Sequence, residues 1–440
     1  MAPLDRPLEG VIPLIGRWDQ PAFLESGPGF GDAGRWSIYA AEPRVLVETL
    51  DDAWSIAIGP GASRDHGRGD PLDQLETWLH RWTPLFWAEP APAPDSPPFQ
   101  GGWIGFLGYD LAPWIETLPR RRARDSRLPD LRLGLYDTAL VHDRRSGRLL
   151  VVAADLMDEG PAATSRRLHH WLDRLRRASP SDFPPTHRPG IPPRSLVDRS
   201  EYLLAVERGL EYIRAGDIFQ VNLSQRFDAW GAVDPLGLFG RLRVLSPSPF
   251  SAYLAWDDLA VISASPEWFY QVRGDRIITR PIKGTRPRGR THEEDLERRG
   301  QLLASPKDRA ELTMIVDLER NDLGRVCRYG TVHVTEGLTV ESYAQVHHLV
   351  ATIEGRLRED VEPVGVLKAL MPGGSITGAP KIRAMQIIDE LEPTRRGLYT
   401  GAIGYFSRGA TAFNIAIRTL IQEGDRLSYQ VGGGIVADSV

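Results

Sequence analysis

The sequence predicts a mixed α and β protein of the α+β class. Strand-like runs of apolar and β-branched residues between turn signals occur at residues 44–50 and 149–154. Amphipathic helical spacing instead marks residues 71–82 and 165–177, which lie among such strands. The chain has 440 residues, of which 42% are hydrophobic, so it can bury a large core, enough for roughly two or three domains.

Charge and composition exclude several classes of function. The net charge of −5 gives no electrostatic case for binding nucleic acid. No stretch approaches the ~20 apolar residues needed to cross a membrane, and residues 1–16 lack the basic start and apolar segment of a signal peptide. The single cysteine, Cys327, excludes an internal disulfide framework and suits a reducing compartment. A soluble, cytoplasmic protein is expected.

Two proline-rich stretches organise the chain. Residues 90–98 predict a flexible or polyproline loop. The second stretch follows a basic helical segment and predicts a linker at residues 179–197, between an N-terminal region (1–178) and a C-terminal region (198–440). The two regions can still share a core, because a change in composition marks organisation and not independent folding.

The C-terminal region opens with a predicted helix and strand. Asp198 and Glu201 form a capping-box pattern at the start of the helix, and Gly216 fits its end. The next residues alternate strictly, with Phe219, Val221, Leu223 and Phe227 on one side and Gln220, Asn222, Ser224 and Arg226 on the other. The polar face is either exposed to water or the wall of a polar pocket, and the pattern alone leaves both open.

Lysines are rare enough to be informative. Only four of the 53 basic residues are lysines: Lys283, Lys307, Lys368 and Lys381. Arginine replaces lysine on a solvated surface but does not act as an amine nucleophile. Lys283 lies where a predicted strand (276–282) runs into a turn, flanked by Arg280, Arg286 and Arg288, and nearby cations should lower its pKa and make the amine more nucleophilic. The alternative is a surface lysine in a basic turn.

The positions of two glutamates make them candidates for functional roles. Glu267 follows the end of a predicted strand (259–265), where reactive groups are often accessible on a rigid scaffold. Glu311 lies on a helix with Ser305 as N-cap, and shares an apolar stripe with the side chains Met314, Ile315 and Leu318. A carboxylate on such a stripe either reaches water or needs a cation, and Mg²⁺ commonly uses one or two protein carboxylates plus waters.

Glycine-rich segments near the C-terminus predict an anion site. Residues 371–381 combine glycines with a helix that starts at Pro380, whose free N–H groups and dipole favour a carboxylate or phosphate, although an ordinary loop remains open. A predicted strand at 412–420 carries Arg418, and a second one at 427–431 runs into three glycines. Together these elements suit a small polyanion.

At this point the motifs resemble a known family. Its pattern is carried by residues 281–289, 311–322, 342–350, 373–381, 399–406 and 432–439, and more loosely by 24–26 and 101–110. The chain resembles the chorismate-utilising enzymes, which include anthranilate synthase component I, isochorismate synthases and aminodeoxychorismate synthase component I. The resemblance implies two large, mostly antiparallel sheets packed as a sandwich, with helices on the outside.

At Lys283, within Pro-Ile-Lys-Gly-Thr, the chain resembles the aminodeoxychorismate synthases, which carry lysine at this position. Anthranilate synthases carry alanine there. The resemblance implies that Lys283 attacks C2 of chorismate bound with Mg²⁺ while Glu267, its pKa raised by burial, protonates the departing 4-hydroxyl. Ammonia from a separate glutamine amidotransferase subunit then gives 4-amino-4-deoxychorismate, for 4-aminobenzoate and folate synthesis. The alternatives are anthranilate synthase component I and a non-catalytic subunit that binds chorismate or tryptophan.

The resemblance also implies further roles. Substrate contacts would come from Thr285, His348, Ser375, Gly378, Ala379, Tyr399, Arg418, Gly432, Gly433 and Gly434. A possible tryptophan site would use Leu24, Glu25, Ser26, Pro249 and Phe250. Glu311 would bind Mg²⁺, and Gln220 stands where isochorismate synthases keep a water-activating lysine, which argues against hydroxylation. The family continues past residues 438–439 with a glutamate-bearing helix that completes the metal site, and this segment is expected to be missing from the sequence.

Overall fold

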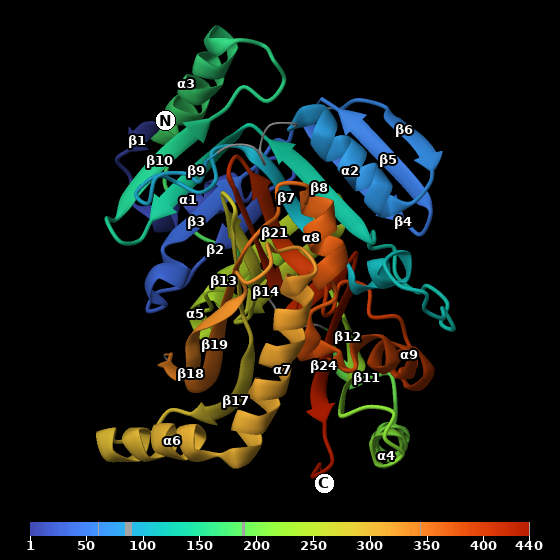
Figure 1. Ribbon diagram of the computed structural model, residues 1–440. Helices are drawn as coiled ribbons and strands as arrows, with labels where there is room; N and C mark the ends of the chain where they lie inside the picture. Colours follow the sequence, from blue (N-terminus) through green and yellow to red (C-terminus); the bar gives the residue numbers. More distant parts are fainter. Residues whose placement is uncertain (60, 84–89, 187–189, 344, 440) are drawn as a thin grey trace.

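The computed structural model describes residues 1–59, 61–83, 90–186, 190–343 and 345–439 (Figure 1). The α-helices are α1 Leu8–Ile15, α2 Pro71–Trp82, α3 Pro161–Arg177, α4 Arg199–Arg214, α5 Pro235–Leu245, α6 His292–Ala304, α7 Pro306–Gly324, α8 Pro363–Leu370 and α9 Lys381–Leu391. Short 3₁₀ turns are η1 Gly31–Gly34, η2 Tyr109–Trp114 and η3 Gly374–Ile376. No helix in these ranges combines the length and the apolar character needed to span a bilayer.

Within the described residues the strands form two antiparallel sheets of 12 strands each. The first sheet has the order β1 Ala2–Leu4, β10 Arg148–Ala153, β9 Thr138–Asp143, β3 Trp36–Ala40, β2 Ala22–Glu25, β13 Phe250–Trp256, β14 Leu259–Ser265, β23 Thr419–Glu423, β24 Arg426–Ile435, β12 Gln220–Trp230 and β11 Ile191–Ser195, and β20 Gly378–Ala379 also pairs with β12. The second has the order β17 Ile282–Pro287, β19 Val346–Arg356, β16 Arg276–Arg280, β15 Trp268–Arg273, β22 Ala410–Ile415, β21 Ala402–Ser407, β7 Gly102–Leu107, β8 Leu131–Tyr136, β4 Val45–Leu50, β5 Ala53–Ile58 and β6 Arg64–Arg68, with β18 His333–Ser342 paired to β19.

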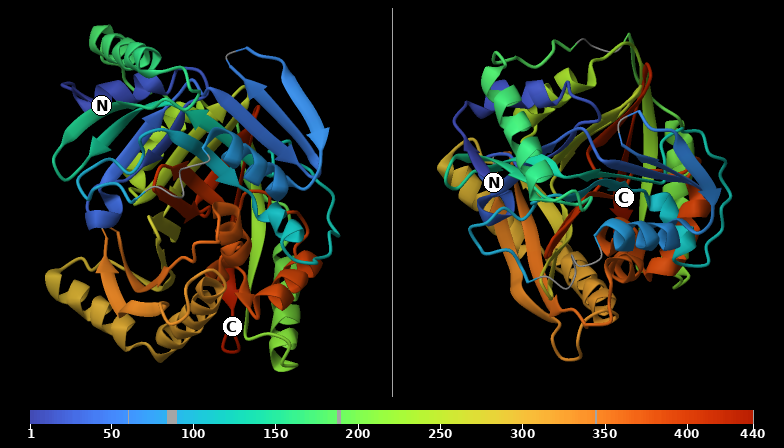
Figure 2. Two further views of the ribbon diagram at one scale, coloured as in Figure 1. Left: turned by 45° about the horizontal axis from the view of Figure 1, so that its top comes forward. Right: turned by 90° about the horizontal axis from the view of Figure 1, so that it is seen from above.

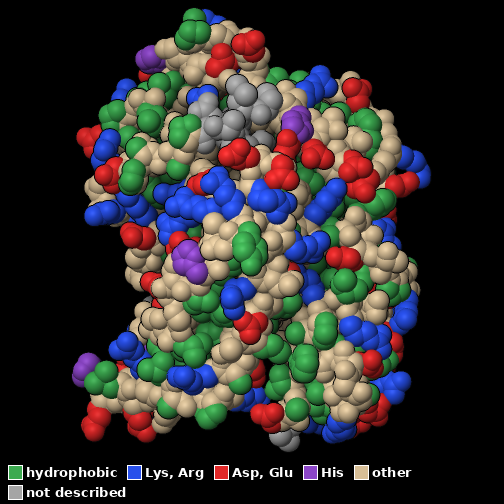
Figure 3. Space-filling view, in the orientation of Figure 1, with side chains coloured by type: hydrophobic (Ala, Val, Ile, Leu, Met, Phe, Trp, Pro, Cys, Tyr) green, Lys and Arg blue, Asp and Glu red, His purple; other side chains and the backbone are tan. Residues whose placement is uncertain are grey.

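The two sheets pack face to face, as the resemblance predicts. One apolar cluster joins Val141, Ala252 and Val261 of the first sheet to Ile104 and Ile403 of the second. Helices cover the outer faces, with α2 against β5 and α3 against β10 (Figures 1 and 2). Acidic and basic side chains are interspersed over the face in Figure 3, apart from a basic band across its middle, and this mixed surface fits the net charge of −5.

Both regions of the chain contribute strands to both sheets. Strand β2 pairs with β13, and β7 pairs with β21, so in each sheet a continuous block of N-terminal strands joins a block of later strands at one pairing. The segment predicted as a linker is also part of the fold, because β11 pairs with β12 and the ring of Phe183 lies 6.4 Å from that of Phe239. The chain therefore buries a core common to both regions, while residues 187–189 of this segment lie outside the described residues.

Most elements that local sequence patterns predict are confirmed. The predicted strand at 412–420 and the position of the three glycines differ from the structure. Helix α2 has the predicted bounds, and the capping box of α4 is formed, with the Asp198 N–H donating to the Glu201 carboxylate at 3.0 Å. The predicted strand at 412–420 is two strands in different sheets, β22 and β23, which are separated at Arg418 with its φ of 50°. The three glycines lie inside β24 and not after it.

Candidate active site

The predicted nucleophile and acid are joined through one serine. The Lys283 ammonium donates to the Ser375 carbonyl at 2.9 Å, and the Ser375 hydroxyl donates to the Glu267 carboxylate at 2.6 Å. Lys283 comes from β17 of the second sheet, Glu267 from the turn between β14 and β15, and Ser375 from η3. Because Glu267 and Ser375 are both buried, this chain of contacts holds an amine and a carboxyl in fixed relation.

Burial sets the protonation of both groups. Burial lowers the pKa of Lys283, and the carboxylates Glu267, Glu311 and Glu319 oppose this effect. Burial raises the pKa of Glu267, against the hydrogen bond from Ser375 and the charge of Lys283. The predicted direction is thus correct for both residues, and each shift favours the neutral form of its group.

The cause predicted for Lys283 is wrong. The flanking arginines do not act on its amine, because each one is paired elsewhere. Their partners are Glu341 for Arg280 at 2.6 Å, Asp308 for Arg286 at 2.8 Å and Asp295 for Arg288 at 2.7 Å. Side chains alternate between the two faces of a strand, so neighbours in sequence need not be neighbours in space.

A second polar group lies along β17 and β19. The Thr285 hydroxyl and the His348 Nδ1 are 2.9 Å apart, and these residues face each other in the register of the two strands. Burial lowers the pKa of His348 to about 4, helped by the charge of Arg418, so this imidazole is neutral at pH 7. Arg418 also acts on Glu267, which links the histidine to the carboxyl of the first group.

Two groups of predicted substrate-binding residues, rich in glycine, lie beside β12. Gly378 and Ala379 of β20 pair with the start of β12, and Gly432–434 of β24 pair with the next residues of that strand. A Cβ atom at Gly432 would lie 2.7 Å from the Tyr399 hydroxyl oxygen, so a side chain there would displace the tyrosine. At Gly433 the same position is open space, and the backbone of the three glycines is exposed. Exposed backbone N–H groups of this kind can bind a carboxylate.

The polar face of β12 is a buried wall. Asn222 donates to the Ile376 carbonyl at 3.0 Å, and the Ser224 hydroxyl donates to Glu392 at 2.8 Å. Gln220 is fully buried, yet both atoms of its amide lack a hydrogen-bond partner among the described residues. Its Nε2 would lie 3.1 Å from a Cβ atom at Gly434, which places the free amide beside the glycines. On the apolar side, Phe219 is an exception to the prediction, since it precedes the strand and is 70% exposed.

Helix α7 buries two carboxylates that the sequence analysis did not single out. Glu311 is half-buried and not on the buried stripe, whereas Glu319 and Asp322 lie on it. Asp322 accepts a hydrogen bond from Lys381 at 2.6 Å. Glu319 lies on the stripe that Leu312 and Ile315 begin, so the helical period could have found it.

Glu311 meets the requirement for one ligand of a divalent cation. Among the described residues its carboxylate has no hydrogen bond or ion pair, and it acts electrostatically on Lys283. Mg²⁺ accepts such a single carboxylate together with water and substrate oxygens. A different acidic cluster, formed by Glu76, His80 and Glu362, has ligating atoms within 4.8 Å of one another but includes none of the predicted residues.

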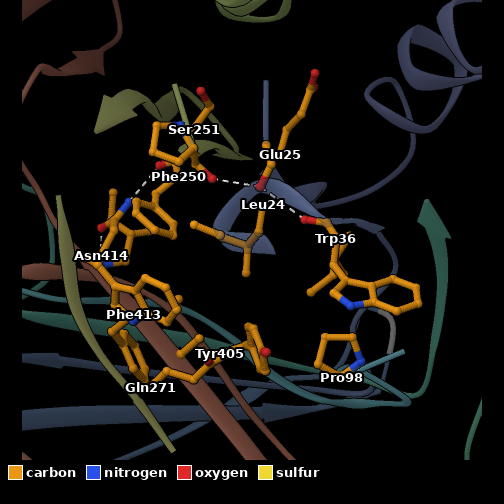
Figure 4. Close-up of a pocket in the computed structure, with 18 of the residues that line it drawn as sticks. Leu24, Glu25, Trp36, Pro98, Phe250, Ser251, Gln271, Tyr405, Phe413 and Asn414 are labelled. Atoms are coloured by element: carbon orange, nitrogen blue, oxygen red, sulfur yellow. Dashed lines mark hydrogen bonds between the residues drawn. The ribbon is translucent and has the colours of Figure 1, made fainter. Parts of the chain in front are cut away.

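A separate cavity brings together the residues predicted to bind tryptophan. Leu24, Glu25, Ser26, Pro249 and Phe250 all line a cavity of about 110 Å³ between the two sheets (Figure 4). Its walls are mainly apolar and aromatic, with further contributions from Trp36, Pro98, Tyr405 and Phe413.

Polar contacts around this cavity are largely internal. The Ser26 hydroxyl donates to the Pro249 carbonyl at 2.7 Å. The carboxylate of Glu25 extends away from the apolar centre and accepts a hydrogen bond from Arg243 at 2.6 Å (Figure 4). Arg273 also lines the cavity, and its Nε has no hydrogen-bond partner among the described residues. A guanidinium is therefore available to a carboxylate at this site.

Comparison with known proteins identifies the family. A family model described as chorismate binding enzyme matches residues 42–440. The chain belongs to the chorismate binding enzymes. Within this family it is 39% identical over 421 residues to aminodeoxychorismate synthase component 1 of Bacillus subtilis (strain 168), which covers 95% of this chain and 87% of that protein.

Other members of the family carry a different name. The chain is 45% identical over 443 residues to anthranilate synthase component 1 of Thermus thermophilus, covering 100% of this chain and 92% of that protein. The crystal structure of anthranilate synthase component I from Streptococcus pneumoniae TIGR4 matches with a TM-score of 0.81 and 33% identity, covering 95% of this chain and 90% of that one. Overall similarity therefore establishes the family, and individual residues must distinguish its branches.

Proposed function

We propose that this chain is the chorismate-aminating subunit of aminodeoxychorismate synthase, which converts chorismate and ammonia into 4-amino-4-deoxychorismate. The observation that carries the proposal is the Lys283 amine, held by the Ser375 carbonyl at 2.9 Å beside the buried acid Glu267. A neutral amine next to a protonated carboxyl is the arrangement that nucleophilic displacement of a hydroxyl requires.

The proposed reaction proceeds in two displacements. Lys283 forms a C–N bond at C2 of chorismate, the two ring double bonds shift, and the C4–O bond breaks as Glu267 supplies the proton that lets the hydroxyl leave as water. Ammonia then adds at C4, the double bonds shift back, and the C2–N bond breaks to release Lys283. One difficult displacement is thus divided into two easier ones through a covalent intermediate.

Substrate recognition in this proposal uses the groups around that pair. The exposed amides of Gly432–434 and the β20 backbone would bind carboxylate oxygens, while Tyr399 and Arg418 would hold the enolpyruvyl carboxylate. Thr285, His348 and Ser375 would line the ring. Glu311 would hold Mg²⁺, which when bound neutralises charge on the ring carboxylate.

Ammonia would come from a partner. The relatives named component 1 support a second component, and we propose that it is a glutamine amidotransferase subunit. The product would serve 4-aminobenzoate and folate synthesis in the cytoplasm. Free ammonia is expected to replace the partner in vitro, since the chain itself would bind chorismate and carry out the displacement.

A product assay tests the proposal. The protein is incubated with chorismate, Mg²⁺ and ammonium at mildly alkaline pH, and products are identified by chromatography and mass. Formation of 4-amino-4-deoxychorismate that Lys283→Ala abolishes, and that Lys307→Ala at an exposed lysine leaves unchanged, is the expected result. Formation of anthranilate and pyruvate would contradict the assignment. It would support the alternative, anthranilate synthase component 1, which is the name of the Thermus relative. Chorismate binding without any product would favour a non-catalytic subunit.

We also propose that the cavity in Figure 4 binds tryptophan. Its aromatic and apolar walls suit an indole ring, and the free Nε of Arg273 suits the ligand carboxylate. Leu24→Trp would fill the cavity, and Leu204→Trp, at a leucine that is 66% exposed, is the control. Calorimetry should show that the first variant loses at least about tenfold in tryptophan affinity, which corresponds to about 1.4 kcal/mol. Unchanged binding by Leu24→Trp would exclude this cavity.

A further inference from the structure

A buried carboxyl on α7 and a backbone carbonyl lie within hydrogen-bond distance of the same hydroxyl group. Glu319 is 8% exposed, and its Oε2 lies 2.6 Å from the hydroxyl oxygen of Thr279, which is itself 3% exposed on β16. The same hydroxyl oxygen lies 2.8 Å from the backbone carbonyl of Phe269. A hydroxyl has one hydrogen to donate, and a carbonyl can only accept. When Thr279 donates to Phe269, the contact with Glu319 is satisfied only if Glu319 donates, and for that it must carry a proton.

The charges around Glu319 favour the same form. The groups that face it are the carboxylates Glu267 and Asp322 and the ammonium groups Lys381 and Lys283. Lys381 is already paired with Asp322 at 2.6 Å, and Lys283 faces Glu267 and Glu311 as well. An ionised Glu319 would therefore be a buried anion without a close cation of its own, which is costly. Burial raises the pKa of Glu319 to about 8, with help from the charges of Glu267 and Asp322 and against the Thr279 hydroxyl and the charge of Lys381.

We infer that Glu319 is a proton-bearing positioning residue that keeps the charge behind Lys283 low, so that the amine can be neutral when it attacks. This inference rests on the proposed function only for the identity of the molecule that the Lys283 amine attacks. An anion near an ammonium stabilises the charged form, so each carboxylate around Lys283 holds it as a cation. Three carboxylates act on Lys283 in this way, Glu267, Glu311 and Glu319, and a proton on Glu319 removes the negative charge of one of them. The hydrogen bond of Glu319 is made with Thr279, and its effect on Lys283 is electrostatic, so we expect it to act on the reaction through Lys283.

Two measurements on the protein without chorismate test the inference. The first is the infrared C=O band of protonated carboxyl groups, recorded for the wild type, Glu319→Gln and, as the control, Asp317→Asn. Asp317 lies on the same helix with its side chain 67% exposed and pairs with Arg320 at 3.1 Å. We expect Glu319→Gln to remove one component of the band at about pH 6.5, Asp317→Asn to remove none, and the wild-type component to titrate away near pH 8. A spectrum that Glu319→Gln leaves unchanged would overturn the inference.

The second measurement is the reactivity of Lys283 itself. Competitive acetylation followed by mass spectrometry can resolve each of the four lysines, with exposed Lys307 as internal standard. Glutamine imitates a protonated carboxyl, so Lys283 should react within about twofold of the wild-type rate in Glu319→Gln at pH 7. An increase of about tenfold would mean that the variant has removed a negative charge and lowered the pKa of Lys283, and it would overturn the inference. Because neither readout involves catalysis, failure of the product assay would leave both results interpretable.

Discussion

Breaking the buried ion pair between Asp322 and Lys381 should cost much more stability when Asp322 is replaced than when Lys381 is replaced. The pair joins α7 to the first residue of α9 at 2.6 Å, and its side chains are 8% and 12% exposed. Lys381 also donates to the Leu370 carbonyl at 3.2 Å, so it is held from two sides. Asp322→Asn leaves this ammonium buried without its counter-ion, and breaking a buried pair in this way costs about 3–5 kcal/mol.

Replacing the other partner, by Lys381→Met, should lower the free energy of unfolding by less. Burial raises the pKa of Asp322 even in the presence of Lys381, so a carboxyl left alone by Lys381→Met can take up a proton and become neutral. The double variant Asp322→Leu with Lys381→Met removes both charges and should lie close to the wild type, as apolar replacements of buried pairs often do. Urea titrations give the free energy of unfolding of the wild type, the two single variants and the double variant, and the three costs are then compared.

If Asp322→Asn lowers the free energy of unfolding by less than about 1 kcal/mol, this reasoning is refuted, because an exposed ion pair contributes that much. The control is Asp317→Asn, which breaks a pair with Arg320 on the exposed side of the same helix and should change stability by at most about 0.5 kcal/mol. Because α9 begins at Lys381, the last residue of the predicted anion-binding segment 371–381, Asp322→Asn should also raise the KM for chorismate.

Three further predictions follow from buried polar groups. Ser375→Ala removes the donor that stabilises ionised Glu267, so the pKa of Glu267 rises and the alkaline limb of kcat/KM for chorismate should move to higher pH; an unmoved limb would separate Glu267 from catalysis. Gln220→Leu replaces an amide without partners and should raise the free energy of unfolding by about 1–3 kcal/mol while weakening chorismate binding, and reduced stability would contradict the unpartnered state. Glu319 has a folded pKa of about 8 against 4.5 unfolded, so the folded state binds the extra proton in this window, and stability should fall by about 1.4 kcal/mol per pH unit between roughly pH 5 and 8. Glu319→Gln should abolish that slope in urea titrations, and a retained slope would assign it to another group.

The sequence predicts elements whose causes are local. Helix α2 has its predicted bounds because Asp70 caps it, accepting from the Leu72 N–H at 2.8 Å, and Pro71 fits its first turn. Strand β14 also matches, since an unbroken apolar run between turn residues needs no distant partner to be recognised. The family motifs add Lys283, Glu267 and their neighbours, which the fold gathers from separate elements.

Other features depend on contacts that no local pattern contains. The run at 412–420 is continuous in sequence, yet Arg418 turns it from one sheet into the other, and only the packing of the two sheets decides where. Arg280 flanks Lys283 in sequence but pairs with Glu341, because the partner strands determine which charges meet. The protonation of Glu319 is a further case, since it depends on a hydroxyl of another strand and on that hydroxyl's second acceptor.

The placement of the site on both sheets explains how one scaffold can serve different chemistry. Lys283 and His348 come from the edge of the second sheet, while Gly378 and Gly432–434 flank β12 in the first. The proposed carboxylate-binding groups are mainly backbone amides and so are insensitive to most substitutions of side chains. The proposed displacement, in contrast, depends on one side chain on β17. Under the proposed reaction, a change at position 283 would alter the chemistry while the substrate stays in place, so we expect the residue at this position, and not an identity of 45% to one branch, to indicate the product.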